Sequence, residues 1–323
     1  MTRFPGMFLG TLLLCAVMTD KALAGWPEQP VKIIVPYAAG GHPDFVARMT
    51  ALGLSKHTGG NFIVENKAGA SGNIGMVQVV NSKADGLTFG LAVSSNLTTN
   101  ALLYSKLPYQ PLHDLALVMK VTSTASVLIV KAESNVATVA ELVALMRREP
   151  DKHNYGNIGL GSFSHMVGEM LASKSGTKVT SILYPGAPPV IADLLRGEIT
   201  FAMLPASTSI PLARAGKVRA LAVTTARRLS AAPEVPTLVE SGVEFVGDAW
   251  AGFVAPAGTP PAALDAFRAA VVAIFDNPEA RAALAQQFVE VNLVTNPNQF
   301  RSEVVDETAR FKPIIDRLNL KLD

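Results

Sequence analysis

Apolar runs alternate along this chain with segments in which apolar residues recur at helical spacing. The first run, Val31–Val35, is rich in β-branched residues and predicts a buried strand. Pro36 and the Gly40-Gly41 pair end that strand, and a helical pattern begins at Pro43, a residue suited to the first helical turn. One face of the predicted helix carries Phe45, Val46, Met49 and Leu52. The sequence therefore predicts a strand, a glycine-rich turn and a helix in succession.

The same succession recurs further along the chain. Strand-like segments, separated by helical ones, lie at Asn61–Glu65, Thr88–Val93, Asn154–Gly156, Val179–Tyr184, Ile199–Met203 and Val218–Thr224. Strands that alternate with helices in this way are typical of βαβ units and of sheets with many parallel strands. We therefore expect an α/β protein.

The segments form two clusters, residues 27–123 and 124–225, joined by strand-like crossings near Thr122–Ser126 and Ala222–Thr225. Three helical segments complete the chain, at Pro261–Phe275, Pro278–Gln287 and Pro297–Leu318. If these helices pack on the first cluster, the chain crosses twice between two lobes. The expected division is lobe 1, residues 25–123 plus 226–323, and lobe 2, residues 124–225. Two crossing strands make a hinge, and ligands bind in the cleft between such lobes.

The first 24 residues have the pattern of a secretory signal peptide, which is removed from the mature protein. Arg3 supplies a positive charge, Met7–Met18 an apolar stretch, and Ala22-Leu23-Ala24 a small-residue cleavage site. The only cysteine, Cys15, lies within this leader, so we expect a mature chain without thiols. The formal net charge of +2 gives no indication of nucleic-acid binding.

Three polar loops follow predicted strands and are candidates for a binding site. They are Tyr37–Asp44 and Ser94–Asn96 in the first cluster and Gly161–His165 in the second. Open α/β sheets bind ligands where strands end. A glycine-rich turn before a helix also exposes backbone N–H groups at the positive end of the helix dipole, which favours an anion.

The run that begins at Pro36 resembles a signature of the periplasmic substrate-binding proteins of tripartite tricarboxylate transporters, the Bug-type family. The matching residues are Pro36, Tyr37, Gly40, Gly41, Asp44, Ala47 and Arg48. Further similarity lies at Gly161-Ser162 with Ser164-His165, at Tyr184 with Gly186, and at Ala255-Pro256 with Gly258-Thr259-Pro260, and it extends over residues 26–323. The chain departs from the pattern at Ala38-Ala39 and at His42-Pro43, where small hydroxyl residues are more usual.

This resemblance implies a two-lobed periplasmic binding protein of the type II or Venus flytrap kind, with a mostly parallel sheet in each lobe. It implies a monomer in the periplasm that captures a small organic anion and delivers it to the permease subunits of a membrane transporter. Backbone N–H groups of Gly40, Gly41 and His42 would bind the carboxylate, Asp44 would orient water or a neighbouring amide, and lobe 2 would close over the ligand. The expected ligand-binding residues are Tyr37, Ala39, Gly40, Gly41, His42, Asp44, Ser95, Asn96, Gly161, Ser162, Ser164, His165 and Tyr184.

Simpler roles remain open for two of these residues. Asp44 could serve only to complement the helix dipole, and the Ser162 side chain could serve only as a helix N-cap. We expect no cofactor, no metal site and no catalytic residue, because His42 has no evident partner, the resemblance implies a structural role for His165, and no G-x-S-x-G motif occurs. Alternative functions are a ligand-sensing receptor for a signalling partner and, less favoured, a hydrolase.

One further departure concerns the ligand. Leu204-Pro205 follows a predicted strand where many family members carry acidic or amide residues that reach an amino group. The resemblance therefore implies a ligand without an amine, such as a mono- or dicarboxylate or an aromatic acid.

Overall fold

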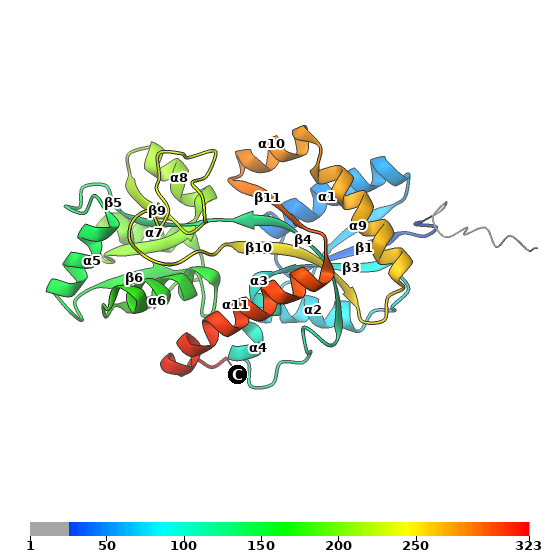
Figure 1. Cartoon of the computed structure of the whole chain (residues 1–323), viewed down its shortest axis with the longest axis horizontal. Helices are drawn as coiled ribbons and strands as arrows, with labels where there is room; N and C mark the ends of the chain where they lie inside the picture. Colours follow the sequence, from blue (N-terminus) through cyan, green and yellow to red (C-terminus); the bar gives the residue numbers. More distant parts are fainter. Residues whose placement is uncertain (1–25, 323) are drawn as a thin grey trace, which may run out of the picture.

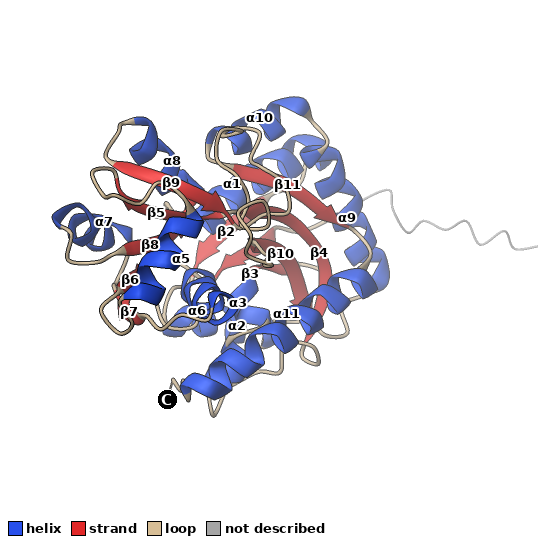
Figure 2. Cartoon of the chain, turned by 60° about the vertical axis from the view of Figure 1, so that its left-hand side comes forward, coloured by secondary structure: helices blue, strands red, loops and turns tan. Residues whose placement is uncertain are grey.

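The computed structural model describes residues 26–322, so the predicted leader and Cys15 lie outside the described residues. The fold contains two β-sheets that lie side by side, each flanked by helices (Figures 1 and 2). No helix within residues 26–322 has the length and apolar character needed to cross a bilayer.

The first sheet has six strands. Their order across the sheet is β11 (Val289–Val294), β4 (Leu115–Thr124), β10 (Ala249–Pro256), β3 (Thr88–Val93), β1 (Val31–Val35) and β2 (Phe62–Asn66). β1 pairs parallel with β2 and β3, whereas β10 runs antiparallel to β3 and β4, and β11 antiparallel to β4. The carboxyl ends of β1, β2 and β3 therefore meet at one edge, from which the polar loops emerge.

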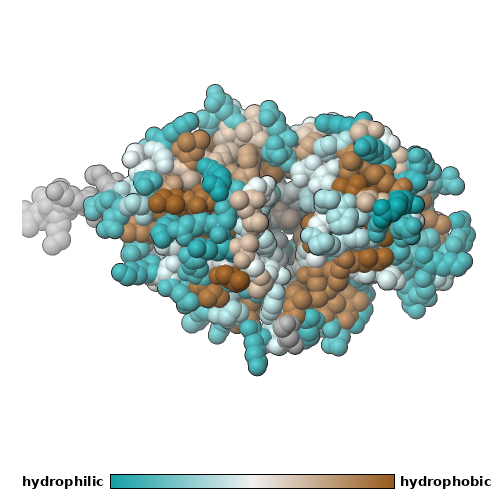
Figure 3. Space-filling model, turned by 180° about the vertical axis from the view of Figure 1, so that it is seen from behind, coloured by the Kyte–Doolittle hydropathy of each residue, from teal (hydrophilic) through white to brown (hydrophobic). Residues whose placement is uncertain are grey.

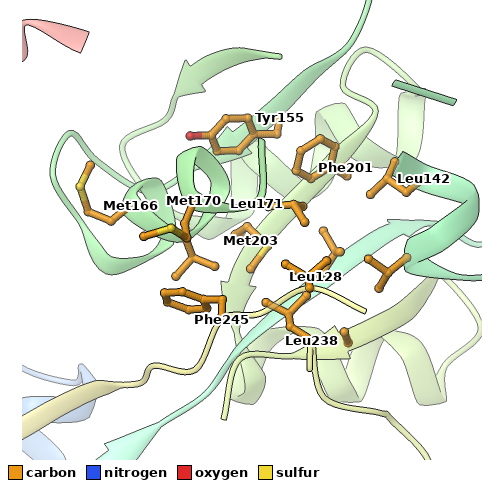
Figure 4. Close-up of a cluster of buried hydrophobic side chains, with 14 of the residues drawn as sticks. Leu128, Leu142, Tyr155, Met166, Met170, Leu171, Phe201, Met203, Leu238 and Phe245 are labelled. Carbon is orange, nitrogen blue, oxygen red and sulfur yellow. The ribbon is translucent and has the colours of Figure 1, made fainter. Parts of the chain in front are cut away.

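The second sheet has five strands. Their order is β7 (Thr180–Leu183), β6 (Asn154–Asn157), β8 (Phe201–Pro205), β5 (Ser126–Lys131) and β9 (Val218–Val223). β6 is parallel to β7 and β8, and β5 is antiparallel to β8 and β9. In its core the rings of Tyr155 and Phe201 stack with centroids 5.3 Å apart (Figure 4). Position 168 requires glycine, because a Cβ there would lie 2.1 Å from the Tyr155 ring.

Helices cover these sheets. Those that follow first-sheet strands are α1 (His42–Thr58), the 3₁₀ turn η1 (Ala70–Gly72), α2 (Asn73–Val80), α3 (Ser94–Leu97) and α4 (Asn100–Leu103). Those of the second half are α5 (Val139–Arg148), α6 (Phe163–Ser175), α7 (Ala187–Arg196) and α8 (Ala206–Arg214). The last three are α9 (Pro261–Phe275), α10 (Pro278–Gln286) and α11 (Pro297–Leu318).

The expected α/β fold of two helix-flanked sheets is confirmed, but both sheets are mixed. Two strands, β10 and β11, escaped prediction, and so did residues 115–121 of β4. β10 contains Gly252, which lowers strand propensity, yet a Cβ at that position would lie 2.7 Å from the Phe300 ring. The lobe boundaries at residues 124 and 225 stay a prediction.

We call the elements around the first sheet and those around the second sheet the two halves of the molecule. The last helix, α11, packs on both halves (Figure 1). Its first half contributes Phe300 and Val304 to a core beneath β10. The C-terminal part of α11 places Phe311, Ile314 and Ile315 in the core of the second sheet, the same cluster from which Figure 4 draws a part. We expected the last helices to pack on the first cluster, residues 27–123. α11 does so, but it also packs on the second sheet.

Glu307, near the middle of α11, is a buried carboxyl. Trp250 Nε1 donates to its Oε2 at 2.7 Å, and Thr98 Oγ1 lies 3.3 Å from its Oε1. The pKa of Glu307 is raised to about 7, chiefly by burial and in part by Asp248, against the opposite effects of the Trp250 hydrogen bond and of nearby Arg310. Because the folded-state pKa is raised, Glu307 lowers stability progressively as the pH rises from about 4.5 to about 7.

Replacing Glu307 by Gln is expected to remove this pH dependence while keeping the hydrogen bond from Trp250. The amide group can also donate to Thr98, whose hydroxyl already donates to Ser94. Since each pKa unit corresponds to about 1.4 kcal/mol, Glu307→Gln should be more stable than the wild type by about 1–3 kcal/mol near pH 8 and equal to it near pH 4.5. Urea unfolding at both pH values measures this. Asp306→Asn, at an exposed site on the same helix, is the control, and an equal gain at both pH values would contradict the prediction.

Candidate functional site

The loop between β1 and α1 is fixed by the carboxylate of Asp44. The Gly40 N–H donates to Asp44 Oδ2 at 2.9 Å, Arg48 Nε donates to the same oxygen at 3.0 Å, and Asn66 Nδ2 donates to Oδ1 at 2.9 Å. Asn66, the last residue of β2, also donates to the Tyr37 carbonyl at 3.1 Å. These hydrogen bonds thus connect the loop after β1 to the end of β2.

Asp44 is only 4% exposed, and burial alone would raise the pKa of its carboxyl. The hydrogen bonds from Arg48, Gly40 and Asn66 outweigh burial, so the pKa lies below its ordinary value. Both oxygens of the carboxylate are already bonded, one to Gly40 of the loop and the other to Asn66 of β2. Asp44 therefore orients the backbone of the loop, including one neighbouring amide.

A cluster of neutral polar groups lies beside this loop, centred on the Tyr37 hydroxyl. Tyr37 OH lies 3.4 Å from Ser95 Oγ and 3.3 Å from Asn96 Nδ2. Asn96 is fully buried; its Oδ1 accepts the Val93 N–H and its Nδ2 donates to the Ser71 carbonyl at 3.0 Å. We call Tyr37, Ser71, Ser95 and Asn96 the Tyr37 cluster.

The turn that carries Ser71 has an unusual backbone. Gly69, Ala70, Ser71 and Gly72 all have positive φ, at 133°, 46°, 53° and 88°. Only glycine adopts such values at little cost, so Ala70 and Ser71 are strained. The Ser71 carbonyl accepts from Asn96 and also from Asn100 Nδ2 at 3.1 Å, and these bonds hold the turn in place.

The loop between β6 and α6 supplies the candidate groups of the second half. Ser162 is the N-cap of α6, as predicted, and its Oγ accepts the His165 N–H at 3.3 Å and donates to the Gly159 carbonyl at 2.7 Å. Ser164 Oγ lies 3.0 Å from Ser162 Oγ. His165 is buried, and its Nδ1 accepts the Gly161 N–H at 3.1 Å. These contacts fix the course of the loop.

The two histidines of these loops are neutral. Burial lowers the pKa of His42 and of His165 to about 4. The Nε2 atom of His42 is buried and has no hydrogen-bond partner among the described residues. The loops 36–44, 69–73, 94–100 and 157–165 contain no Lys or Arg, so an anion there would be held by N–H and hydroxyl donors. Within residues 26–322, no three His, Asp or Glu side chains are grouped as metal ligands.

The structure brings together some of the expected residues and not others. Tyr37, Ser95 and Asn96 share one cluster, and Gly161, Ser162, Ser164 and His165 share one loop. The Tyr184 N–H donates to the carbonyl of Asn157, where that loop begins, at 3.0 Å, but its hydroxyl donates to Asp193 of α7 at 2.6 Å. Sequence reasoning missed Ser71, Asn73, Asn100 and Tyr104, although the glycine pair around Ala70-Ser71 is a signal for unusual backbone.

The face opposite to that of Figure 1 is hollowed between its two halves (Figure 3). The first-sheet loops and the second-sheet loop are in contact, because Thr99 Oγ1 donates to the Gly161 carbonyl at 3.0 Å. The candidate groups of the two sheets thus lie around one junction.

Comparison with protein-family models matches residues 46–320 to the family described as the tripartite tricarboxylate transporter family receptor, TctC. A similar curated protein is BugT of Bordetella pertussis, 30% identical over 319 residues that span 98% of this chain and 97% of BugT.

Solved structures with the same fold include R. palustris Rpa4515 with adipate, at 31% identity and a TM-score of 0.80, covering 92% of this chain and 99% of that one. The periplasmic binding protein BugD has 30% identity and a TM-score of 0.75, with coverage of 92% and 99%. MatC from Rhodopseudomonas palustris with bound malate has 26% identity and a TM-score of 0.76, with coverage of 90% and 100%.

Replacement of Asn96 by Ala is expected to destabilise the protein by about 1–3 kcal/mol, because the buried Val93 N–H and Ser71 carbonyl each lose a partner. The free energy of unfolding from urea titrations measures this loss. Asn298→Ala, at an exposed site on α11, is the control. Equal losses in the two variants would show that Asn96 does not hold the strained turn.

Proposed function

The chain belongs to the TctC family of tripartite tricarboxylate transporter receptors, which are solute-binding proteins and not enzymes, and we propose that it captures a small organic acid for a membrane permease. Homologues of this chain are periplasmic binding proteins, and we infer the same location for the mature protein. Its binding step is capture of the acid between the two halves of the molecule, without bond chemistry.

The observation that supports this proposal best is the set of neutral donors where α1 begins. The loop of Gly40 and Gly41 opens α1, a long helix whose first N–H groups have no partner within the helix. The orphaned Nε2 of His42 lies at the same helix start. A carboxylate would accept hydrogen bonds from such groups and would gain from the helix dipole.

The same loops lack a free carboxylate that could bind an ammonium group of a ligand. Asp44 is the one carboxylate in the loops 36–44, 69–73, 94–100 and 157–165, and Arg48 already neutralises it. Leu204, which stands where acidic or amide residues are frequent in the family, is fully buried in the core around β8. We therefore infer a ligand with carboxylates and without an amine, in keeping with the adipate and malate bound by two relatives.

Calorimetric titration of the leader-free protein with L-malate and L-aspartate tests this inference, because the two acids differ only in a hydroxyl against an amine. Malate or adipate is expected to bind, aspartate at least about 10-fold more weakly, and adipamide, which lacks carboxylates, not measurably. Tight binding of aspartate would overturn the inference about the amine. Failure of every organic acid in a thermal-shift screen would overturn the function itself.

Asp44→Asn is expected to weaken binding of the acid about 10-fold, because the loop loses charge-assisted bonds that orient its N–H groups. It should also cost about 1–3 kcal/mol of stability near neutral pH. The lowered pKa of Asp44 means that this stability is present above the ordinary pKa and is lost as the pH falls through the folded-state pKa. Wild type and variant should therefore converge in strong acid.

The matched control is Asp114→Asn. Asp114 also accepts a backbone N–H from four residues earlier, that of Gln110 at 2.7 Å, but its carboxylate is bonded to Gln110 and His113 and to no member of the Tyr37 cluster. Circular dichroism verifies the fold of both variants. An unchanged dissociation constant for Asp44→Asn, measured by calorimetry, would remove Asp44 from the binding site.

A further inference from the structure

The short helix α4 and the residues at its two ends contact both halves of the candidate site. On the side of the second sheet, Thr99 Oγ1 donates to the Gly161 carbonyl at 3.0 Å, and Thr99 is only 2% exposed. The Leu103 side chain is fully buried and belongs to the hydrophobic core of the second sheet, although it is carried by the first. α4 is therefore inserted into the opposite half.

On its other side, the same segment holds the strained turn of the first half. Asn100 Nδ2 donates to the Ser71 carbonyl at 3.1 Å and to Asn73 Oδ1 at 2.7 Å. Tyr104 OH donates to Ser71 Oγ at 3.2 Å. Residues 99–104 thus contact Ser71 and Gly161, one residue from each of two separate loops.

The fit at Gly161 leaves no free space. Gly161 has a φ of +70°, a value that residues with a side chain rarely adopt. A Cβ at this position would lie 1.9 Å from Leu103 Cδ1. Both the backbone conformation and the close approach of Leu103 therefore require glycine.

The position of α4 is itself fixed. The Leu322 N–H donates to the Leu103 carbonyl at 2.9 Å, and the hydroxyl of Thr98, next to Thr99, lies 3.3 Å from the Glu307 carboxyl of α11. The C-terminal segment and α11 thus hold α4 against both loops, so a displacement of one loop is transmitted through packed groups to the other.

We propose that Thr99, Leu103 and Gly161 are positioning residues that set the relative placement of the Ser71 turn and the Gly159–His165 loop, and thereby the affinity of the binding site. This inference rests on the proposed function, because it concerns the same site. The mechanism is preorganisation: donors held at the correct separation before the acid arrives need less ordering when it binds.

The test uses Thr99→Val, which keeps the shape of the side chain and removes only the hydroxyl. Thr259→Val is the matched control, because Thr259 is also buried and donates one 2.8 Å bond to a carbonyl, that of Pro256, at the start of α9. The expected mature chain has no cysteine, so Lys83→Cys and Lys174→Cys introduce unique spin labels at exposed sites, one after α2 and one in the last turn of α6.

The distance distribution between these labels, measured by pulsed electron resonance without ligand, should broaden or shift in Thr99→Val and remain unchanged in Thr259→Val. Malate or adipate should bind Thr99→Val about 3- to 10-fold more weakly, the range expected for one buried hydrogen bond. Gly161→Ala is a second variant and should give a larger change in both measurements.

The inference is overturned if Thr99→Val keeps both the wild-type distance distribution and the wild-type affinity, or if Thr259→Val changes them equally. A wild-type protein that binds neither acid would instead contradict the proposed ligands. In that case the distance distributions between the two spin labels, measured without ligand, would still decide whether Thr99 positions the loops.

Discussion

The Gly69–Gly72 turn imposes the main constraint on this molecule, because its backbone runs through positive φ at four successive residues. Left-handed backbone costs about 1–2 kcal/mol at a residue with a side chain, and Ala70 and Ser71 both have one. Such a turn persists only if its surroundings hold it. The Asn96 and Asn100 amides do so, by donating to one carbonyl. The segment from α3 to α4 is therefore fixed where it can also reach the second sheet.

Much of this architecture was predictable from local pattern. The proline-initiated helices α9 and α11 begin and end where the sequence indicates, and Ser162 caps α6 as expected. These features depend on residues close in sequence. The roles of Asn96, Asn100 and Thr99 were not predictable, because their partners lie 25, 29 and 62 residues away. Nothing in an Asn-Leu-Thr-Thr-Asn run indicates which carbonyls it will meet.

The contrast between Asp44 and Tyr184 shows the limits of a motif. Both match the family pattern, yet Asp44 ties the loop after β1 to the end of β2, whereas the Tyr184 hydroxyl is bonded to Asp193 on α7. A signature identifies residues that recur together, not the contact that each one makes. The buried Asp44 carboxylate orients the backbone before α1 and lies in the first turn of that helix, so complementing the helix dipole and orienting a neighbouring amide are compatible roles.

The absence of charged donors in these loops makes the proposed binding of an anion depend on where the loops lie. A lysine or arginine attracts an anion from many directions, but these loops hold neither, and burial keeps His42 and His165 neutral. Neutral N–H and O–H donors stabilise a carboxylate only at hydrogen-bond distance and with good alignment. A site made of such donors from two sheets therefore depends on the packing that fixes the sheets relative to each other. Thr99 and Leu103, buried against Gly161, supply that packing at the point where the donors meet.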